Sequence, residues 1–335
     1  MVQKALIGEI GDVDLRLLRV FKAVVDAGGF SAAELELNIG RSTVSRHIAD
    51  LEDRLGFVLC TRGRSGFALT DEGRLVHEAA QRLLASVEGF RNDLRSLQAD
   101  LSGSLQLALF DKTATNPKSH IAQAVREFRA MAPAVSIEVS VDTITAIEGG
   151  VLDGRFHLGV TPDHRRSDAL RYLPLFTERM DLYCGRQHPL YDAGHRPLTL
   201  EDLRRHDYVG LGFHSPNMEA THRFGLRRRA SVTDQEGVAT LVLSGCFIGF
   251  LPDHYAEGFV ARGLLRKIAL PEVAYDVLFV AVTRRSPAPP RVAQAFLESL
   301  ERAHGDTANV IPAEAGTQGI AEGMQGSSGS PPPRG

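Results

Sequence analysis

Residues 30–56 constrain the fold more than any other part of this 335-residue chain. They predict two short helices joined by a tight turn at residues 38–40, where Asn and Gly interrupt the helix-forming runs. Ser31 followed by Glu34 has the spacing of a capping box and predicts the start of the first helix. The second helix is expected from about Arg41. Its apolar residues recur at spacings of four, three and four on one buried face: Val44, Ile48, Leu51 and Leu55.

The opposite face of the second helix carries short hydrogen-bonding and cationic side chains, with no acid before Asp50. Arginine reads guanine edges, and serine or threonine contacts bases and phosphates, so such a helix fits the major groove of DNA. An ordinary amphipathic helix pair with a solvated polar face would show the same pattern. The residues of this face are Arg41, Ser42, Thr43, Ser45, Arg46 and His47.

The neighbouring segments favour the DNA-binding interpretation. Residues 14–29 predict a preceding helix, and residues 59–70 predict a hairpin with a basic, glycine-rich tip suited to a phosphate backbone. Residues 1–64 hold nine basic and nine acidic residues, so this segment has no net charge. Phosphate must therefore be neutralised by basic side chains that are gathered on one face. We therefore predict DNA contacts from Ser31, from the polar face of the second helix, and from Arg62 and Arg64 in the hairpin.

The first 75 residues resemble the LysR-type transcriptional regulators. The matching phrases are LLRVFKAVVDAGGFSAAELEL, STVSRHIADLEDRLG and LCTRGRSGFALTDEG. The resemblance implies a winged helix-turn-helix that binds double-stranded operator DNA. One departure is Gly40-Arg41, where the family usually has Ser-Gln, so the family's base preference does not carry over to Arg41.

Residues 70–102 change in character, because apolar residues alternate there at spacings of four and three. This heptad seam is typical of a coiled coil and predicts a dimerisation helix, which also matches the linker helix of the resembled family. The alternative is a helix that packs on its own domain. The predicted dimerisation residues are Val76, Ala80, Leu83, Val87, Phe90, Leu94 and Leu97.

Strand and helix patterns alternate from residue 104 onward and predict a parallel sheet with helices on its faces. The phrases LPLFTERMDLYCGRQHPL and LVLSGCFIGFLP also resemble the LysR family, in its effector-binding domain. The implied fold class is multidomain: an all-α winged helix-turn-helix and linker helix, followed by an α/β domain with two subdomains, like periplasmic binding proteins.

The expected domains follow from these patterns. A winged helix-turn-helix DNA-binding domain occupies residues 12–69, a linker and dimerisation helix 70–102, and an effector-binding domain 103–303. Subdomain I covers about 104–164 and 270–303, and subdomain II about 165–269. Residues 304–335 are rich in Gly, Ser, Pro and Ala and are expected to form a disordered tail.

The effector site is predicted where the first strand of the α/β domain ends. Ligands of parallel α/β sheets bind beyond the carboxyl ends of the strands, against helix N-termini, which favour anions. Threonines that merely cap helices and close turns would give the same pattern. The polar groups expected to face this crevice suggest a small, carboxylate-bearing effector, and they are Lys112, Thr113, Thr115, Asn116, Thr143, Thr145 and Thr161.

Other functions find less support in the sequence. The chain shows no metal-binding spacing and no nucleophile–base pattern, so we expect no catalytic residues, no metal and no cofactor. No apolar run is long enough to span a membrane and the N-terminus lacks a signal-peptide pattern, so a cytoplasmic protein is expected. The three cysteines, Cys60, Cys184 and Cys246, leave a thiol-based redox-sensing regulator as an alternative function. An α/β small-molecule-binding protein or enzyme is a further alternative, with less support.

The predicted function is therefore that of a sequence-specific, DNA-binding transcriptional regulator of LysR type. A small molecule in the cleft of the C-terminal domain would control it. Dimers would form through the linker helices and, by resemblance to the family, assemble into a homotetramer.

Overall fold

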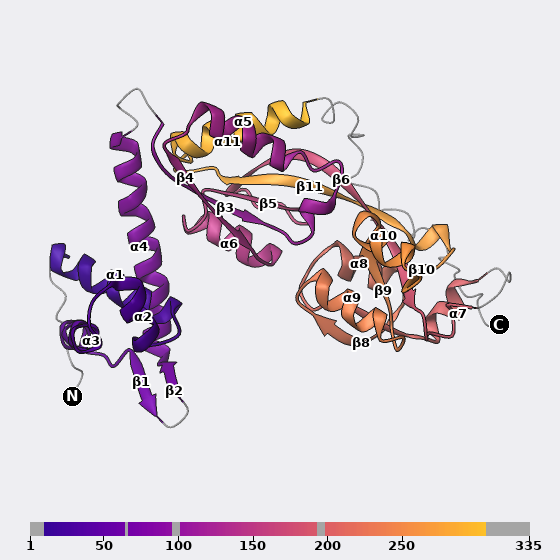
Figure 1. The fold of residues 1–335 in the computed structure, drawn as a ribbon, viewed down its shortest axis with the longest axis horizontal. Coiled ribbons are helices and arrows are strands. Elements are labelled where there is room, and N and C mark those ends of the chain that lie inside the picture. Colours follow the sequence, from indigo (N-terminus) through magenta and orange to yellow (C-terminus); the bar gives the residue numbers. More distant parts are fainter. Residues whose placement is uncertain (1–9, 64–65, 96–100, 193–197, 306–335) are drawn as a thin grey trace, which may run out of the picture.

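The computed structural model describes residues 10–63, 66–95, 101–192 and 198–305. Figure 1 shows an N-terminal helical domain with a small hairpin, one long helix rising from it, and an α/β domain built around a sheet. Across these described ranges, no helix is both long enough and apolar enough to cross a membrane.

The N-terminal domain is a three-helix unit with a β-hairpin wing. Its core is built from one face of each helix, and the expected apolar face of residues 41–55 is buried at every position. Leu59, at the entrance to the wing, completes this core with no exposed surface. The elements are α1 (Asp12–Asp26), α2 (Phe30–Leu37), α3 (Arg41–Leu55), β1 (Cys60–Gly63) and β2 (Gly66–Leu69).

The expected capping box at Ser31 is wrong. α2 begins one residue earlier, at Phe30, and no side chain caps it. Gly28 and Gly29 adopt φ values of 73° and 150°, which favour glycine, and this turn delivers Phe30 directly into the core. The Phe30 ring packs edge-on against Phe67 of the wing, with 5.8 Å between ring centroids.

The long helix α4 (Asp71–Arg95) follows the wing directly. The Thr70 hydroxyl accepts a hydrogen bond from the Gly73 amide at 2.9 Å and so satisfies a free N–H of the first turn. Gly73 is required there, because an added Cβ would lie 1.9 Å from the Leu59 carbonyl oxygen. This close approach fixes the direction in which α4 leaves the N-terminal domain (Figure 1).

The first part of the α/β domain has the predicted parallel topology. β3 pairs in parallel with β4 on one side and β5 on the other. The Phe128 ring of α5 packs edge-on against Phe296 of the C-terminal helix α11, with centroids 5.4 Å apart. The elements are β3 (Gly103–Leu109), η1 (Thr113–Thr115), α5 (Ile121–Met131), β4 (Val135–Val141), α6 (Ile144–Leu152), β5 (Leu158–Pro162) and α11 (Arg291–His304).

The second part of the domain forms its own parallel group, in which β7 pairs with both β8 and β9. Helices α8, α9 and α10 surround these strands (Figure 1). The elements are α7 (Leu200–Arg204), β7 (Asp207–Leu211), α8 (Pro216–Phe224), β8 (Arg227–Val232), α9 (Gln235–Leu243), β9 (Ile248–Pro252), α10 (Asp253–Ala261) and β10 (Leu265–Lys267).

Two long strands, β6 (Leu170–Gly185) and β11 (Tyr275–Arg284), join the two parts into one sheet. The order is β4-β3-β5-β11-β6-β9-β7-β8, with β10 also paired to β6. β6 and β11 are antiparallel to each other and to their other neighbours, so the sheet is mixed rather than parallel throughout. A short turn, η2 (Pro271–Val273), precedes β11.

β6 and α11 both extend further than local sequence signals suggest. β6 runs from Leu170, because Pro174 is accommodated beside a register shift in the pairing with β11 instead of ending the strand. The last helix runs to His304, which is buried and stacks on Phe176, so it belongs to the domain rather than to the tail. Residues 306–335, and with them the expectation of a disordered tail, lie outside the described residues.

Candidate DNA interface and effector pocket

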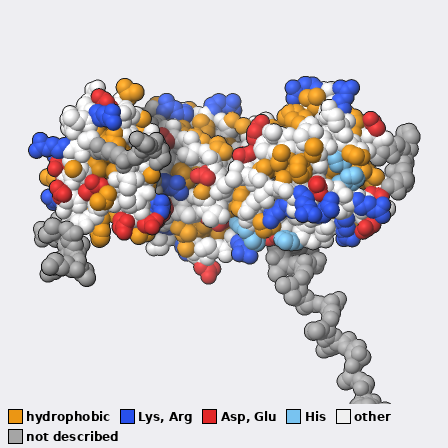
Figure 2. All heavy atoms as spheres, turned by 90° about the horizontal axis from the view of Figure 1, so that it is seen from below, with side chains coloured by type: hydrophobic (Ala, Val, Ile, Leu, Met, Phe, Trp, Pro, Cys, Tyr) orange, Lys and Arg blue, Asp and Glu red, His pale blue; other side chains and the backbone are white. Residues whose placement is uncertain are grey.

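The polar face of α3 points away from the core of the N-terminal domain. Four of the six residues predicted on it are exposed, and Ser45 and His47 are half-buried at its edges. Among the described residues, the guanidinium groups of Arg41 and Arg46 have no ion-pair partner, so both are available to an external anion. Acidic and basic side chains are intermixed over the N-terminal domain in Figure 2, in keeping with its balanced charge. The exposed four are Arg41, Ser42, Thr43 and Arg46.

An ion pair fixes the opposite end of α3. Arg54 donates two hydrogen bonds to the Asp14 carboxylate of α1, at 2.6 and 3.0 Å, and the Gly11 amide donates a third at 2.9 Å. The Arg54 hydrogen bond, followed by that of Gly11, lowers the pKa of Asp14 below its ordinary value. Glu52 accepts from the Leu59 amide at 2.7 Å and so ties α3 to the wing. These contacts at the C-terminal end of α3 hold the helix, and with it its polar face, in position.

The remaining predicted DNA-contact residues lie in α2 and in the wing. Ser31 is exposed in the second position of α2. Arg62 lies in β1 of the wing, and Arg64 at the wing tip lies outside the described residues.

The predicted dimerisation seam divides into two parts along α4. Val76 packs against the core of the N-terminal domain and Ala80 is buried, so this end is covered by the chain itself. Leu83 and Val87 are half-buried, and the Phe90 side chain is 63% exposed. Leu94 also lies on α4, and Leu97 lies outside the described residues. The half of the seam farther from the N-terminal domain therefore leaves apolar surface uncovered.

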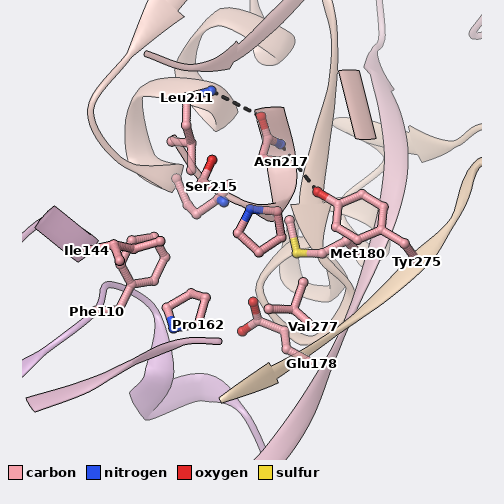
Figure 3. Close-up of a pocket in the computed structure, with 12 residues that line it drawn as sticks. Phe110, Ile144, Pro162, Glu178, Met180, Leu211, Ser215, Asn217, Tyr275 and Val277 are labelled. Carbon is pink, nitrogen blue, oxygen red and sulfur yellow. Dashed lines mark hydrogen bonds between the residues drawn. The ribbon is translucent and has the colours of Figure 1, made fainter. Parts of the chain in front are cut away.

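A pocket lies between the two parts of the α/β domain (Figure 3). The space within it is about 270 Å³ when the adjoining open solvent is included. Residues from both parts line it, together with residues of the connecting strands β6 and β11. The lining residues are Phe110, Ile144, Pro162, Glu178, Met180, Leu211, Ser215, Pro216, Asn217, Gln235, Tyr275 and Val277.

Three helix N-termini border this pocket. Ile144, Pro216 and Gln235 are the first residues of α6, α8 and α9. Free N–H groups and the positive end of the helix dipole make such positions favourable for anions. Asn217 is held in place because its amide oxygen accepts from the Leu211 amide at 3.1 Å and from the Tyr208 hydroxyl at 3.0 Å.

A buried acid, Glu178, lies among the mostly apolar walls. Its Oε2 is 2.9 Å from Nε2 of His254, and Nδ1 of His254 is 2.9 Å from the Thr115 hydroxyl. Desolvation raises the pKa of Glu178, and the hydrogen bond from His254 partly offsets this effect. Desolvation also raises the pKa of Asp111 to about 6, although Asp111 accepts a 2.7 Å hydrogen bond from the Gln235 amide.

Several contacts bridge the pocket from the loop after β3 to the opposite part of the domain. The Lys112 ammonium is 2.7 Å from the Glu236 carboxylate and 4.6 Å from the centre of the Tyr255 ring. The Tyr255 hydroxyl donates to the same carboxylate at 2.8 Å. We call these contacts, together with the Thr115–His254 hydrogen bond, the cross-pocket clasp.

None of the seven residues predicted to bind the effector is among the pocket-lining residues. Lys112 and Thr115 belong to the clasp, Thr113 and Asn116 are buried beside it, and Thr145 is exposed. Thr143 caps α6 by accepting from the Ala146 amide at 3.4 Å, and Thr161 is buried. The structure instead places their sequence neighbours Phe110, Ile144 and Pro162 at the pocket.

The residues that sequence reasoning missed come from the second part of the domain and from the connecting strands. Two signals were present. Ser215-Pro216 and Asp234-Gln235 have the N-cap and first-turn chemistry of helix starts. Glu178 lies between Phe176 and Met180 on the same face of its strand, where an apolar residue would be expected.

Within the described part of the chain, no group of three or more His, Cys, Asp or Glu side chains could hold a metal ion. Among the described residues no two cysteines form a disulfide: Cys60 is half-buried, Cys184 buried and Cys246 exposed.

Comparisons with known proteins agree with this architecture. A family profile described as "LysR substrate binding domain" matches residues 98–305, and one described as "Bacterial regulatory helix-turn-helix protein, lysR family" matches residues 15–74. The HTH-type transcriptional activator BauR of Pseudomonas aeruginosa is 41% identical over 294 residues, which cover 88% of this chain and 96% of BauR.

Solved structures share the same fold. The LysR family regulator CbnR matches with a TM-score of 0.61 at 22% identity, covering 87% of this chain and 99% of CbnR. Full-length CbnR complexed with its target DNA matches with a TM-score of 0.59 at 22% identity, covering 86% of this chain and 99% of that one.

A winged helix-turn-helix joined to an α/β effector-binding domain defines a transcriptional regulator controlled through its second domain. The family profiles and the similarity to BauR then place the chain itself: it belongs to the LysR family of transcriptional regulators.

Proposed function

We propose that this regulator binds operator DNA through the polar face of α3 and responds to a small, carboxylate-bearing molecule in the pocket. The observation that carries the effector proposal is that α6 and α8 both begin at one small pocket, because a helix N-terminus favours a bound anion. The third N-terminus, that of α9, already holds the Asp111 carboxylate on its first amide. In this proposal six of the seven predicted effector residues support the pocket from behind rather than line it, and the exposed Thr145 takes no part.

The assembly we propose is a dimer joined along the outer half of the α4 seam, with two dimers forming a tetramer. Two-fold symmetry would then set two α3 helices in successive major grooves, one helical turn apart. A ligand that binds one arrangement of the subunits more tightly shifts the population toward it and so alters the spacing of the α3 helices.

The effector proposal is tested by calorimetric titration of the full chain with short carboxylates and with their primary amides. Carboxylates should bind and the uncharged amides should bind at least severalfold more weakly. Equal affinities for acid and amide would contradict an anion site.

The supporting role of the loop threonines has its own test. Thr143→Val removes the cap of α6, whose first residue lines the pocket, so carboxylate affinity should fall a few-fold. Thr113→Val, at a buried position of η1, should have a comparable effect, and Thr145→Val, at an exposed position of α6, is the matched control. Parent affinity in both Thr143→Val and Thr113→Val would show that these loops take no part.

The redox-sensor alternative receives little support from the cysteines. Burial raises the pKa of the Cys184 thiol to about 11, and the thiol rather than the reactive thiolate therefore dominates at neutral pH. Titration of free thiols before and after peroxide treatment tests this alternative, and loss of two thiols per chain would favour it. We also propose that the protein is not an enzyme, since its matched relatives are named as regulators.

A further inference from the structure

The pocket has a second chemical feature besides the helix N-termini. Two of its buried side chains carry acceptor oxygens that no hydrogen-bond donor of the described residues reaches. Glu178 and Gln235 are only 4% and 3% exposed. Within the part of the chain that the structure describes, the Gln235 side-chain oxygen has no hydrogen-bond partner, although the backbone amide of the same residue donates to Asp111. Figure 3 shows the Glu178 carboxylate directed into the pocket, on the side of Pro162.

The surroundings of Glu178 leave room for a cation. Its Oε2 is hydrogen-bonded to His254, and among the described residues no hydrogen bond reaches Oε1. No Lys or Arg is among the pocket-lining residues. Asp111 adds to this excess of acceptors, because one of its buried carboxylate oxygens is also without a partner and it contacts Gln235. Buried acceptors that lack donors are costly, and a bound group that donates to them recovers this cost.

We propose that the effector is a small zwitterion, whose ammonium group is bound by the Glu178 carboxylate and the Gln235 side-chain oxygen. This inference rests on the proposed function, which supplies the carboxylate end at the N-termini of α6 and α8. A primary ammonium has three donors and no acceptor, which suits a group of unpaired acceptors. Phe110, Met180 and Val277 provide apolar wall for a short hydrocarbon between the two charged ends.

Other cations fit less well. A metal ion needs several ligands, and no cluster of three His, Cys, Asp or Glu side chains exists in the part of the chain that the structure describes. A diamine would put its second positive charge against the N-termini of α6 and α8, which favour anions. The N-terminus of α9, beside the ammonium site, differs because its first amide already donates to the Asp111 carboxylate.

The first experiment uses the wild-type full chain and needs no substitution. Calorimetric titrations compare three ligand series of matched length: straight-chain carboxylates, the same carboxylates bearing one ammonium group, and straight-chain amines. The amino-substituted carboxylates should bind about tenfold more tightly than the plain carboxylates, as expected for one additional charge-assisted hydrogen bond.

The second experiment assigns the ammonium site. Glu178→Gln keeps the size of the side chain and removes its charge, so the preference for the amino-substituted ligand should fall from about tenfold to less than twofold. The affinity for plain carboxylates should stay the same or rise. Glu257→Gln, an exposed position on α10, removes the same charge outside the pocket and should keep the full preference.

The outcomes separate this inference from the proposed function. Tight binding of plain carboxylates with no gain from the ammonium group would overturn the zwitterion and leave the carboxylate effector standing. Equal binding of amines and amino-substituted carboxylates would support the ammonium site and refute the carboxylate. A folded Glu178→Gln protein that keeps the tenfold preference would show that the ammonium lies elsewhere, and binding of none of the three series would refute both proposals. Should Glu178→Gln not fold, the wild-type series alone still decides the ligand class.

Discussion

At the scale of single residues, the proposed DNA contacts lie on a surface of α3 that the fold leaves largely exposed. Arg46 and Thr43 are exposed on α3, while Val44 and Ile48, one and two positions away from them, are buried in the core. A substitution on the exposed face can therefore change DNA affinity without touching the fold.

Arg46→Ala should weaken operator binding by about 1–3 kcal/mol, the range for an arginine that contacts a base edge, and Thr43→Ala should weaken it less. Binding to random DNA should change little. Fluorescence anisotropy with a genomic fragment selected by the protein, and with a scrambled fragment, measures both affinities. Arg262→Ala, at the exposed C-cap of α10, removes the same charge as a control. Equal losses on both DNAs would show that Arg46 contacts only phosphate.

The Asp14–Arg54 pair predicts a pH dependence with a defined sign. The folded-state pKa of Asp14 is lowered, so the pair stabilises the N-terminal domain fully above the ordinary carboxyl pKa near 3.8 and less as pH falls through the lowered value. Asp14→Asn should therefore lower the melting temperature of this domain at pH 7, and the difference should shrink below about pH 4. Scanning calorimetry at several pH values checks this. Asp12→Asn, on the exposed first turn of α1, is the control. An Asp14→Asn difference that does not change with pH would mean that packing, not charge, is lost.

At the scale of elements, the sequence predicts a helix or strand well where the residues that determine it are close together in the chain. The α3 helix was predicted within its observed bounds because Val44, Ile48, Leu51 and Leu55 follow a strict helical spacing. α9 likewise begins at a local signal, because the Asp234 side chain before it accepts a hydrogen bond from the Gly237 amide at 2.7 Å. The pocket could not be foreseen in full, because Glu178 and Asn217 meet only through the pairing of β6 and β11 and the packing around it.

The linker helix carries a prediction about assembly. Leu83→Asp combined with Phe90→Asp places two carboxylates on the exposed half of the seam, and burying them unpaired in an interface is costly. Light scattering should show a smaller assembly than the parent forms. Ala79→Asp with Ser86→Asp adds the same two charges, seven residues apart, to an exposed face of the same helix and should leave the mass unchanged. If the seam variant keeps the parent mass, dimers form through another surface.

At the scale of the whole molecule, the pocket is bounded by two bodies that share β6 and β11 and are also held by the cross-pocket clasp. The clasp lies beside the pocket-lining residue Gln235, because Glu236 follows it directly in α9. Ligand affinity should therefore depend on contacts that never touch the ligand, through the population of the closed arrangement.

Lys112→Met tests this dependence. It removes the ion pair with Glu236 and the cation–π contact with Tyr255, which together should lower ligand affinity about threefold to tenfold. Calorimetry with the tightest ligand of the series measures the change. Lys118→Met, an exposed lysine after the same loop, is the control. Unchanged affinity in Lys112→Met would show that β6 and β11 alone fix the pocket.

The strand order also has a consequence for how the chain is made. β11 lies between β5 and β6, yet among the described strands its residues 275–284 are the last to leave the ribosome. Until they emerge, β5 and the first part of β6 have open edges, while β7, β8 and β9 are already available to pair with one another. An open strand edge is a template for pairing with another chain. If translation stopped between residues 270 and 275, the product would have β7, β8 and β9 paired with one another. Its β5 and the first part of β6 would lack their partner strand, and these open edges would favour aggregation.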